Sequence, residues 1–379
     1  MSDIDIWDLG EKIYIKPNIS FLKKINFLIR TGFNSKEKLY KKIKEDVKVP
    51  LSTFKNFMKY SYYNRNYYGS LKVFIICCSK LGISKFELQE NIISYKTQRG
   101  YNIIENPILP IKITPIFDMI LAHNIADGTV IFFEGRQPYF GYRQYDELFR
   151  ELYIRKIESV FGKIKFKSGD YFKKTTRSYC PAVVSQLFFK LYDLNERSFL
   201  SKEARLPKEI LDKEKSYLLA VLLAFIIDEG NVDSTLISIK LKNPSLTEDL
   251  YKVCLKLNYD CSLKIKNDYG ILYIKKMAMK KLFDDYKELF KRYPECNLGK
   301  ISNKIELSLN ITSRSIRYVK GNKDLIFRML RLEDLTVNQI ATKINMTRQG
   351  VRFHIKSLEV DKKIFRKGHM GERNIIYGV

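Results

Sequence analysis

Two apolar segments of this chain, about a hundred residues apart, follow one pattern and end in an acidic residue and a glycine. Residues 120–128 read Ile-Leu-Ala-His-Asn-Ile-Ala-Asp-Gly, and residues 222–230 read Leu-Leu-Ala-Phe-Ile-Ile-Asp-Glu-Gly. The acids Asp127 and Glu229 are 102 residues apart, which is the length of a small domain. The pattern predicts a tandem duplication in which two helices bring two carboxylates to one place.

A second regularity recurs at nearly the same offset. Lys163, Lys165 and Lys167 alternate with apolar residues, and so do Lys264 and Lys266. Alternation with a period of two predicts strands that carry lysines on one face and apolar side chains on the other. Because Lys264 follows Lys163 by 101 residues, two independent coincidences support the duplication.

The helix and strand patterns predict the same order of elements after each motif. Each unit reads as a motif helix, two strands, a second helix, two more strands and a third helix. The segments that follow the motifs are 130–142, 146–160, 163–178 and 182–192 in the first unit, and 235–242, 246–257, 261–275 and 278–291 in the second. The predicted fold class is α+β, with two tandem α-β-β-α-β-β-α units.

Proline-rich and pattern-breaking stretches separate these units from the ends of the chain. The prolines of residues 106–115 break helices, because proline lacks a backbone donor and restrains the residue before it. The chain of 379 residues is also longer than one core usually serves. The predicted domains are residues 1–105, 106–210, 211–315 and 316–379.

Residues 1–105 are predicted to form a helical domain. Within residues 36–59, two helical patterns meet near residues 47–50, and Ser52 or Thr53 could cap the second helix. This arrangement is typical of a helix-turn-helix. An ordinary helical bundle with a solvated charged surface fits the same pattern equally well.

The last domain follows the element order of a winged helix. Helices are predicted over residues 325–332, 336–344 and 347–358, and a hairpin over residues 362–379. The third helix would be the one that enters a DNA groove. The side chains on its first turns, which are the expected base contacts, are Thr347, Arg348, Gln349 and Arg352. A module that binds protein instead of DNA is the alternative.

Charge points to a polyanion as the partner of this chain. The sequence has 68 Lys and Arg residues against 42 Asp and Glu residues, a formal net charge of +26. Double-stranded DNA is the first expectation, with structured RNA as the alternative. The apolar run of residues 217–227 is shorter than the roughly 20 residues needed to cross a bilayer. No secretory signal is recognisable, so we expect a cytoplasmic protein that binds no membrane.

The two motifs imply a metal site if their helices pack in parallel. Small residues at Ala122, Ala126 and Ala224 would allow such close packing. Asp127 and Glu229 would then lie together at two helix C-termini, where each repels the other and meets the negative end of the helix dipole. A hard cation such as Mg²⁺, or Mn²⁺, would neutralise them and could act on a phosphodiester bond.

The pair of motifs, with the repeated units around them, resembles the LAGLIDADG (dodecapeptide, or DOD-type) homing endonucleases in their single-chain, two-repeat form. The second motif is similar to the variant common in archaeal members. The resemblance covers residues 116–306 and implies a pseudo-twofold saddle of two antiparallel sheets that straddles DNA. It also implies that Asp127 and Glu229 bind metal, with Gly128 and Asp228 beside them as further candidate ligands. The first motif departs from the family pattern at His123 and Asn124.

The family places a lysine near the active site late in each repeat. The matching candidates here are Lys202, Lys300 and Lys304, and each could equally be a solvated surface lysine. The sheet faces would contact DNA. Their candidate side chains, besides the five alternating lysines, are Arg136, Gln137, Tyr139, Arg143, Gln144, Lys240, Lys242 and Lys275.

The function expected from these observations is a monomeric, Mg²⁺-dependent endonuclease that cuts both strands of DNA at a specific site. Two alternatives stay open. One is a transcription regulator that keeps the saddle without cleavage, which the altered first motif and the terminal modules would suit. The other is an intron maturase that binds RNA.

His123 stands one turn before Asp127, so it could hydrogen-bond that carboxylate. A histidine buried at the interface of the two motif helices is the simpler interpretation.

Overall fold

The computed structural model describes residues 3–10, 12–59, 67–98, 100, 102–131, 137–166, 176–310, 321–344, 346–369 and 375–379. The protein is a mixed α+β protein with antiparallel sheets, as the sequence predicts. Its contacts form two compact units, Met1–Asn310 and Ile311–Val379. None of the helices in the described ranges is both long and apolar enough to cross a membrane.

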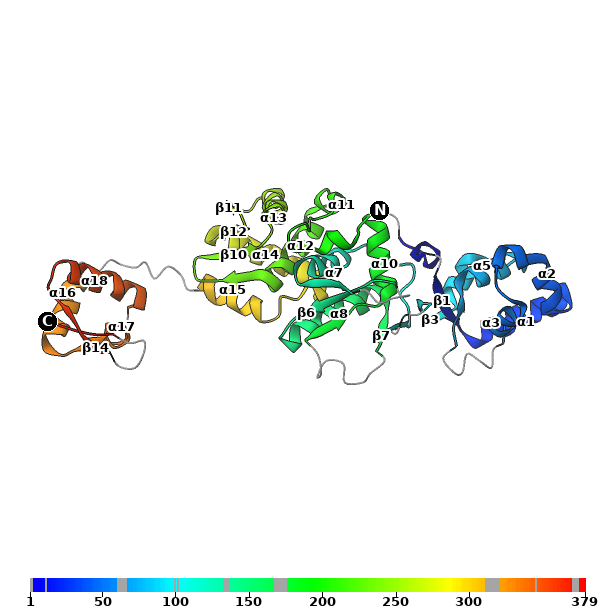
Figure 1. The fold of residues 1–379 in the computed structure, drawn as a ribbon, viewed down its shortest axis with the longest axis horizontal. Coiled ribbons are helices and arrows are strands. Elements are labelled where there is room, and N and C mark those ends of the chain that lie inside the picture. The colour runs from blue at the N-terminus through cyan, green and yellow to red at the C-terminus, as the bar shows by residue number, and fades with distance from the viewer. Residues whose placement is uncertain are drawn as a thin grey trace. The chain divides into compact units, whose positions relative to one another are not determined.

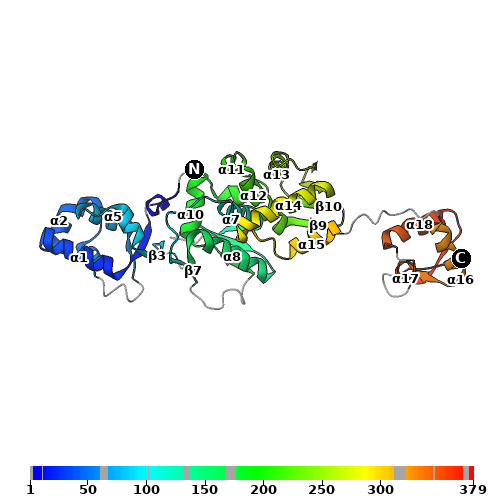
Figure 2. The same cartoon turned by 180° about the vertical axis from the view of Figure 1, so that it is seen from behind.

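Two apolar helices, α7 (Pro115–Ala126) and α12 (Lys215–Glu229), pack side by side in the first unit (Figures 1 and 2). These are the helices predicted from the two motifs. Both are buried along almost their whole length, which is why neither shows an apolar stripe on a single face. Ala122 and Ala224 are fully buried, and their small side chains permit close approach of the two backbones.

Each of these helices passes directly into a strand at its glycine. The strands are β5 (Gly128–Ile131) and β9 (Gly230–Val232). A Cβ atom on Gly128 would lie 2.2 Å from the carbonyl oxygen of Asn124, and one on Gly230 would lie 2.4 Å from that of Ile226. Both motifs therefore need glycine for the same reason, because the strand leaves the helix in contact with the carbonyl four residues earlier.

The second repeat forms a four-stranded sheet in the order β11-β12-β10-β9. Apolar residues at every second position of β10 and β12 are buried on one face, where the repeat's two other helices pack. These elements are β10 (Leu236–Leu241), α13 (Pro244–Lys256), β11 (Cys261–Lys266), β12 (Tyr269–Lys275) and α14 (Lys276–Arg292). They follow the order that the sequence predicts.

The first repeat has the same order of elements but divides its strands between two sheets. Its elements are β5, β6 (Tyr139–Arg143), α8 (Glu147–Phe161), β7 (Lys163–Lys165), β8 (Arg177–Tyr179) and α10 (Ala182–Leu191). The strands β5, β6 and β8 form one sheet, whereas β7 pairs with β4 (Ile103–Glu105). Gly162 permits this, because its φ of 109° and the close approach of Asn106 leave no room for a side chain between α8 and β7.

The N-terminal part of this unit contains a sheet that the sequence patterns did not predict. The five-stranded sheet has the order β2-β1-β3-β4-β7 and crosses the domain boundary expected at residue 105. Its other strands are β1 (Ile13–Pro17), β2 (Gly69–Ser70) and β3 (Ile92–Thr97). The helical elements around it are η1 (Ile6–Leu9), α1 (Ile19–Phe33), α2 (Lys36–Val47), α3 (Leu51–Phe57), α5 (Leu71–Lys80) and α6 (Lys85–Glu90). Helices α2 and α3 match the two helical patterns in residues 36–59.

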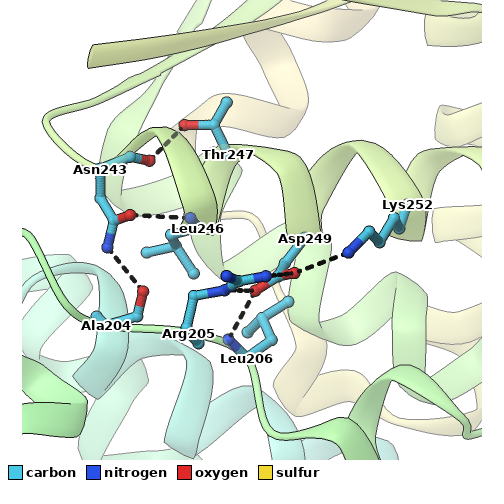
Figure 3. A network of polar contacts seen from close by, with 8 residues as sticks. All are labelled: Ala204, Arg205, Leu206, Asn243, Leu246, Thr247, Asp249 and Lys252. Atoms are coloured by element: carbon cyan, nitrogen blue, oxygen red, sulfur yellow. Dashed lines mark hydrogen bonds and ion pairs between the residues drawn. The ribbon is translucent and has the colours of Figure 1, made fainter. Parts of the chain in front are cut away.

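The connection between the repeats is fixed to α13, as Figure 3 shows. It includes η2 (Glu196–Phe199) and α11 (Lys208–Leu211). Arg205 donates two hydrogen bonds to Asp249, from Nε at 2.6 Å and from a terminal nitrogen at 2.7 Å. Asn243 donates to the carbonyl of Ala204 at 2.7 Å. This bidentate pair and the amide contact hold the connection in one position over the second repeat.

After α14 the chain continues through η3 (Pro294–Cys296) and α15 (Lys300–Asn310), which packs against α14 and β9. The unit Ile311–Val379 has a hydrophobic core of its own. Its elements are α16 (Asn322–Leu332), β13 (Leu335–Thr336), α17 (Val337–Lys343), α18 (Arg348–Val360), β14 (Phe365–His369) and β15 (Ile375–Gly378). The three strands form one sheet in the order β13-β15-β14.

The glycine geometry makes a prediction about stability. We expect Gly128→Ala and Gly230→Ala each to lower the free energy of unfolding by about 1–3 kcal/mol, because the new methyl group meets a backbone carbonyl that cannot move aside. Gly32→Ala in α1 is the control, since nothing lies within 4 Å of its Cβ position and alanine favours a helix. Urea unfolding measures all three. Equal stability of the control and the two motif variants would contradict the assignment.

Candidate active site

Asp127 and Glu229 lie at the C-terminal ends of α7 and α12, and each is partly buried. Burial, followed by the charge of Asp228, raises the pKa of Asp127 to about 7. Burial raises the pKa of Glu229 to about 7 as well, and Asp127 and Asp228 add to the shift. In the described part of the chain, no lysine or arginine forms an ion pair with either carboxylate. Among the described residues, the pair therefore has no ion-pair partner when it ionises, although the charge of Arg143 partly opposes the rise in the pKa of Asp127.

Gln144, the residue directly after β6, contacts this pair. Its Nε2 donates a hydrogen bond of 2.9 Å to Oδ2 of Asp127. The carbonyl of Gln144 accepts a hydrogen bond of 2.6 Å from the buried Arg150, which fixes the end of the strand. The sequence suggested Gln144 as a contact to DNA. The structure instead places its amide on the Asp127 carboxylate.

Asp228 is enclosed between the two repeats. Its side chain is 0% exposed, and Tyr142 donates a hydrogen bond of 2.6 Å to Oδ1. His123 Nδ1 lies 2.8 Å from Oδ2, and burial lowers the pKa of His123 well below its usual range, so the neutral ring donates to the carboxylate. Both oxygens are thus occupied away from solvent. The role of Asp228 as a metal ligand, which the family resemblance suggested, stays a prediction, and His123 contacts Asp228 instead of Asp127.

The polar residues that interrupt the first motif belong to one buried network. Tyr142 stacks on Tyr153, with 4.4 Å between ring centroids and 25° between planes. The hydroxyl of Tyr153 donates a hydrogen bond of 2.9 Å to Asn124, whose amide donates to the carbonyl of Ile120 at 2.7 Å. His123 and Asn124 are therefore polar side chains at buried positions that have hydrogen-bond partners inside the protein.

A buried lysine near this network was missed in the sequence. Lys156 lies on α8 and is 1% exposed, and burial lowers its pKa to about 8, while Cys296 and then Asp228 act in the opposite direction. The sequence pattern that could have predicted its burial is its position beside Tyr153 and Ile157 on the apolar face of the helix. Its charge favours the ionised form of Asp228, whose pKa burial raises to about 8.

A second buried contact joins the repeats at the other end of the helix pair. Lys213, just before α12, donates to both oxygens of Asp118 on α7, at 2.8 and 2.6 Å. The hydroxyl of Tyr192 donates to Asp118 at 2.5 Å. Burial raises the pKa of Asp118, and the charge of Lys213 opposes that shift. The two helices are thus connected by buried polar contacts near both ends.

Among the described residues, the three lysines that the family resemblance suggested form no polar contact with the carboxylate pair. Lys300 donates to Asp146 at 2.8 Å. Lys202 and Lys304 are exposed, in a turn and on α15 respectively. No hydrogen bond or ion pair joins these three to Asp127 or Glu229 within the described ranges, so their catalytic role stays a prediction. Gly128 pairs with Tyr142 in the first-repeat sheet and is partly exposed, and its role as a carbonyl ligand also stays a prediction.

The outer face of the second-repeat sheet gathers lysines around one tyrosine. Lys240 and Lys266 lie over the ring of Tyr269, at 4.5 and 5.5 Å from its centroid. Lys240 on β10 and Lys264 on β11 pair with the same residue of β12, the strand that lies between them. Lys242 is exposed as well, and Lys275 pairs with Asp260 at 2.8 Å. The predicted lysines on β10, β11 and β12 therefore share one face, whereas Tyr269 between them was not predicted from the sequence.

The predicted contacts of the first repeat are dispersed. Tyr139 and Arg143 lie on the outer face of β6, and Gln137, which precedes that strand, is partly buried. Lys163 and Lys165 are exposed as the alternation predicts, yet they lie on β7 and hence on the N-terminal sheet. Two other predicted contacts, Arg136 and Lys167, lie outside the described residues.

The predicted base contacts of the C-terminal unit lie at the start of α18. Thr347 is its N-cap and accepts a hydrogen bond of 3.1 Å from the backbone of Gly350. Arg348, Gln349 and Arg352 are exposed on the helix. Their exposure leaves them accessible to a partner of this unit.

No protein-family model and no curated protein sequence matches this chain. Solved structures of homing endonucleases are similar to it. I-DmoI in complex with DNA and Ca is 13% identical with a TM-score of 0.34, over 51% of this chain and 97% of that chain. I-WcaI bound to its DNA recognition sequence is 13% identical with a TM-score of 0.33, over 51% of this chain and 86% of that chain.

Another similar structure is the full-length DUF199/WhiA protein from Thermatoga maritima. It is 12% identical with a TM-score of 0.27, over 66% of this chain and 92% of that chain. Further structures of I-DmoI are complexes with DNA and Mn, or with its target DNA in the presence of Mg. These similarities concern the fold and assign no residue of this chain a role.

The enclosure of Asp228 makes a prediction about stability. Tyr142→Phe leaves one oxygen of a buried carboxylate without its donor, so we expect it to lower the free energy of unfolding by about 1.5–3 kcal/mol. Tyr145→Phe is the matched control, because Tyr145 is 75% exposed and the change should be within about 0.5 kcal/mol of neutral. Urea unfolding of both variants tests this. An effect of equal size in both would show that the hydrogen bond to Asp228 contributes nothing specific.

Proposed function

We propose that this chain is a double-strand DNA endonuclease of the LAGLIDADG homing type, which hydrolyses phosphodiester bonds with a divalent metal ion. One observation carries the proposal. Asp127 and Glu229 end two helices packed side by side, and burial and neighbouring carboxylates raise the pKa of both, without an ion-pair partner among the described residues. Such a pair costs stability, and a cation between the carboxylates would remove that cost.

The residues present fit a hard divalent cation such as Mg²⁺ or Mn²⁺. Oxygen ligands from two carboxylates suit these ions, and the C-terminal ends of two helices add negative potential. The described residues contain no group of three or more His, Cys, Asp or Glu side chains that would enclose an ion. We therefore infer an open site that water and phosphate oxygens complete. A bound ion would activate a water molecule and stabilise the leaving oxygen.

The protein side chains hold and orient the carboxylates. The amide of Gln144 donates to Asp127 and so fixes which oxygen stays open to a ligand. Asp228, His123 and Tyr142 fix the register of the two helices through their buried contacts. Because both carboxylates come from one chain, a monomer suffices for the reaction.

The duplex would lie against the outer faces of the two repeat sheets. The lysines around Tyr269 give the second-repeat face a positive charge suited to phosphate contacts. We propose further that the unit Ile311–Val379 is a winged helix that adds DNA contacts through α18. Such a protein would act in the cytoplasm on cellular DNA.

A transcription regulator that binds DNA without cutting is the second candidate. The observation that favours it is the C-terminal unit, which has its own core and an exposed, basic start of α18. Both candidates bind duplex DNA, so cleavage alone separates them.

Removal of either carboxylate tests catalysis. We expect Asp127→Asn and Glu229→Gln each to lower the cleavage rate at least about a hundredfold, because the metal ion loses a charged ligand, while DNA affinity changes little. The assay is linearisation, with Mg²⁺, of plasmids carrying duplexes that the protein selects from a random library. Asp284→Asn, an exposed acid on α14, is the control. Binding without cleavage by the unsubstituted protein would favour the regulator.

The raised carboxylate pKa values predict that metal binding depends on pH. Since Asp127 and Glu229 must lose protons to bind a cation, the affinity for Mn²⁺ should rise about tenfold per pH unit for each proton released below pH 7. Calorimetric titration at pH 6 and pH 8 measures this. Without metal, Asp127 and Glu229 bind more protons in the folded state than in the unfolded state between about pH 4 and 7, so their contribution to stability should fall as the pH rises through this range. Metal affinity independent of pH would contradict the site.

A further inference from the structure

Two lysine pairs that occupy equivalent positions in the sequence lie on different sheets, because β7 does not join the sheet of its own repeat. Lys264 and Lys266 lie on β11, which pairs only with β12 and forms the edge of the second-repeat sheet within the described residues. Lys163 and Lys165 lie on β7, which pairs with β4 and so belongs to a sheet that continues into the N-terminal region. Within the described residues, the first-repeat sheet therefore ends at β8, and β7 forms the edge of the N-terminal sheet instead.

The N-terminal sheet and the first-repeat sheet are covered by the same two helices. Helix α8 contacts β7 and β8, and helix α10 contacts β3 and β6. The inner residues Tyr95, Ile104 and Ile164 of the N-terminal sheet are at most 5% exposed. The outer faces of both sheets are consequently turned away from α8 and α10.

The two sheets also meet at their neighbouring strands. The side-chain amide of Asn102, next to β4, donates a hydrogen bond of 3.2 Å to the carbonyl of Tyr179 on β8. Arg177, on the same strand β8, stands opposite Arg143 of β6 on the outer face of the first-repeat sheet. The outer surface thus continues from β6 and β8 to β4 and β7.

The continued surface is positively charged. Lys163 and Lys165 are exposed on β7, and Lys96 on β3 occupies the same face, at the border where Tyr68 covers the sheet. The acid found on this face among the described residues is Glu105, which pairs with Lys165 at 3.0 Å. Three lysines against one acid leave a net positive face, as on the second-repeat sheet.

We propose that the face formed by β4, β7 and Lys96 is an additional surface that contacts duplex DNA and lengthens the footprint on the side of the first repeat. The inference rests on the proposed duplex binding. The DNA backbone carries regularly spaced phosphates. Where it extends beyond the first-repeat sheet, its phosphates would contact these lysines. The footprint is therefore asymmetric about the Asp127 and Glu229 pair, since the N-terminal sheet adjoins the first-repeat sheet at β8, whereas no further sheet adjoins β11 among the described residues.

Hydroxyl-radical footprinting of the full chain, on a duplex that it selects from a random library, tests the proposal. The double variant Lys163→Ala with Lys165→Ala should remove protection at one end of the footprint. The double variant Lys264→Ala with Lys266→Ala should remove protection on the other side of the Asp127 and Glu229 pair. Lys96→Gln should shorten the same end as the first pair, and Lys96→Arg should restore it. The slope of log affinity against log salt should fall by about 0.9 for each phosphate that a variant no longer binds.

The matched control is Lys280→Ala with Lys291→Ala on α14, the helix that packs on the inner face of the second repeat. Like the β7 pair, it removes two exposed lysines, one of which pairs with a glutamate. We expect an unchanged footprint and salt slope. Unaltered thermal unfolding midpoints confirm that all variants fold.

Two outcomes would overturn the proposal, and they are distinguishable. The additional surface is excluded if the footprint is unchanged both in Lys96→Gln and in the double variant Lys163→Ala with Lys165→Ala. Duplex binding by the protein would still stand in that case. Absence of any footprint with the unsubstituted protein removes duplex binding itself, and the additional surface with it.

Discussion

The parallel contact between α7 and α12 is the constraint on which the rest of the first unit depends. Each helix is buried on almost all sides and can be stable only when other elements surround it. The partner helix, the sheets and the outer helices provide that environment. The same contact brings Asp127 and Glu229 together, so the burial that stabilises the fold also creates the repulsion that a metal ion would relieve.

Buried polar contacts at both ends of the helix pair determine how the helices align. Apolar packing alone tolerates sliding of one helix against the other, whereas an unpaired buried charge is costly. Asp118 with Lys213 and Asp228 with His123 each place one partner on either side of the interface. We infer that these contacts select one register. A small shift in that register would separate the two carboxylates.

The sequence allowed the motif helices, the order of helices and strands and the alternation of exposed lysines with apolar residues to be predicted, because these depend on local periodicity. Gln144 shows where such reasoning stops, since its type suits DNA equally well and only the end of β6 brings it to Asp127. Asp228 shows the same limit. Its neighbours His123 and Tyr142 come from positions 105 and 86 residues away, and no spacing in the sequence indicates them. The N-terminal strands were missed because their pairing is long-range and each is short.

The sequence by itself determined that two apolar helices with one pattern each end in a carboxylate and are followed by the same order of strands and helices, since helix and strand periodicity depend on the order of residues. The tertiary structure decided which acids remain accessible. It buried Asp228 between hydrogen-bond donors and left Asp127 and Glu229 partly exposed. It also decided that β7 leaves its own repeat for the N-terminal sheet, because strand pairing depends on which edge lies within reach in space.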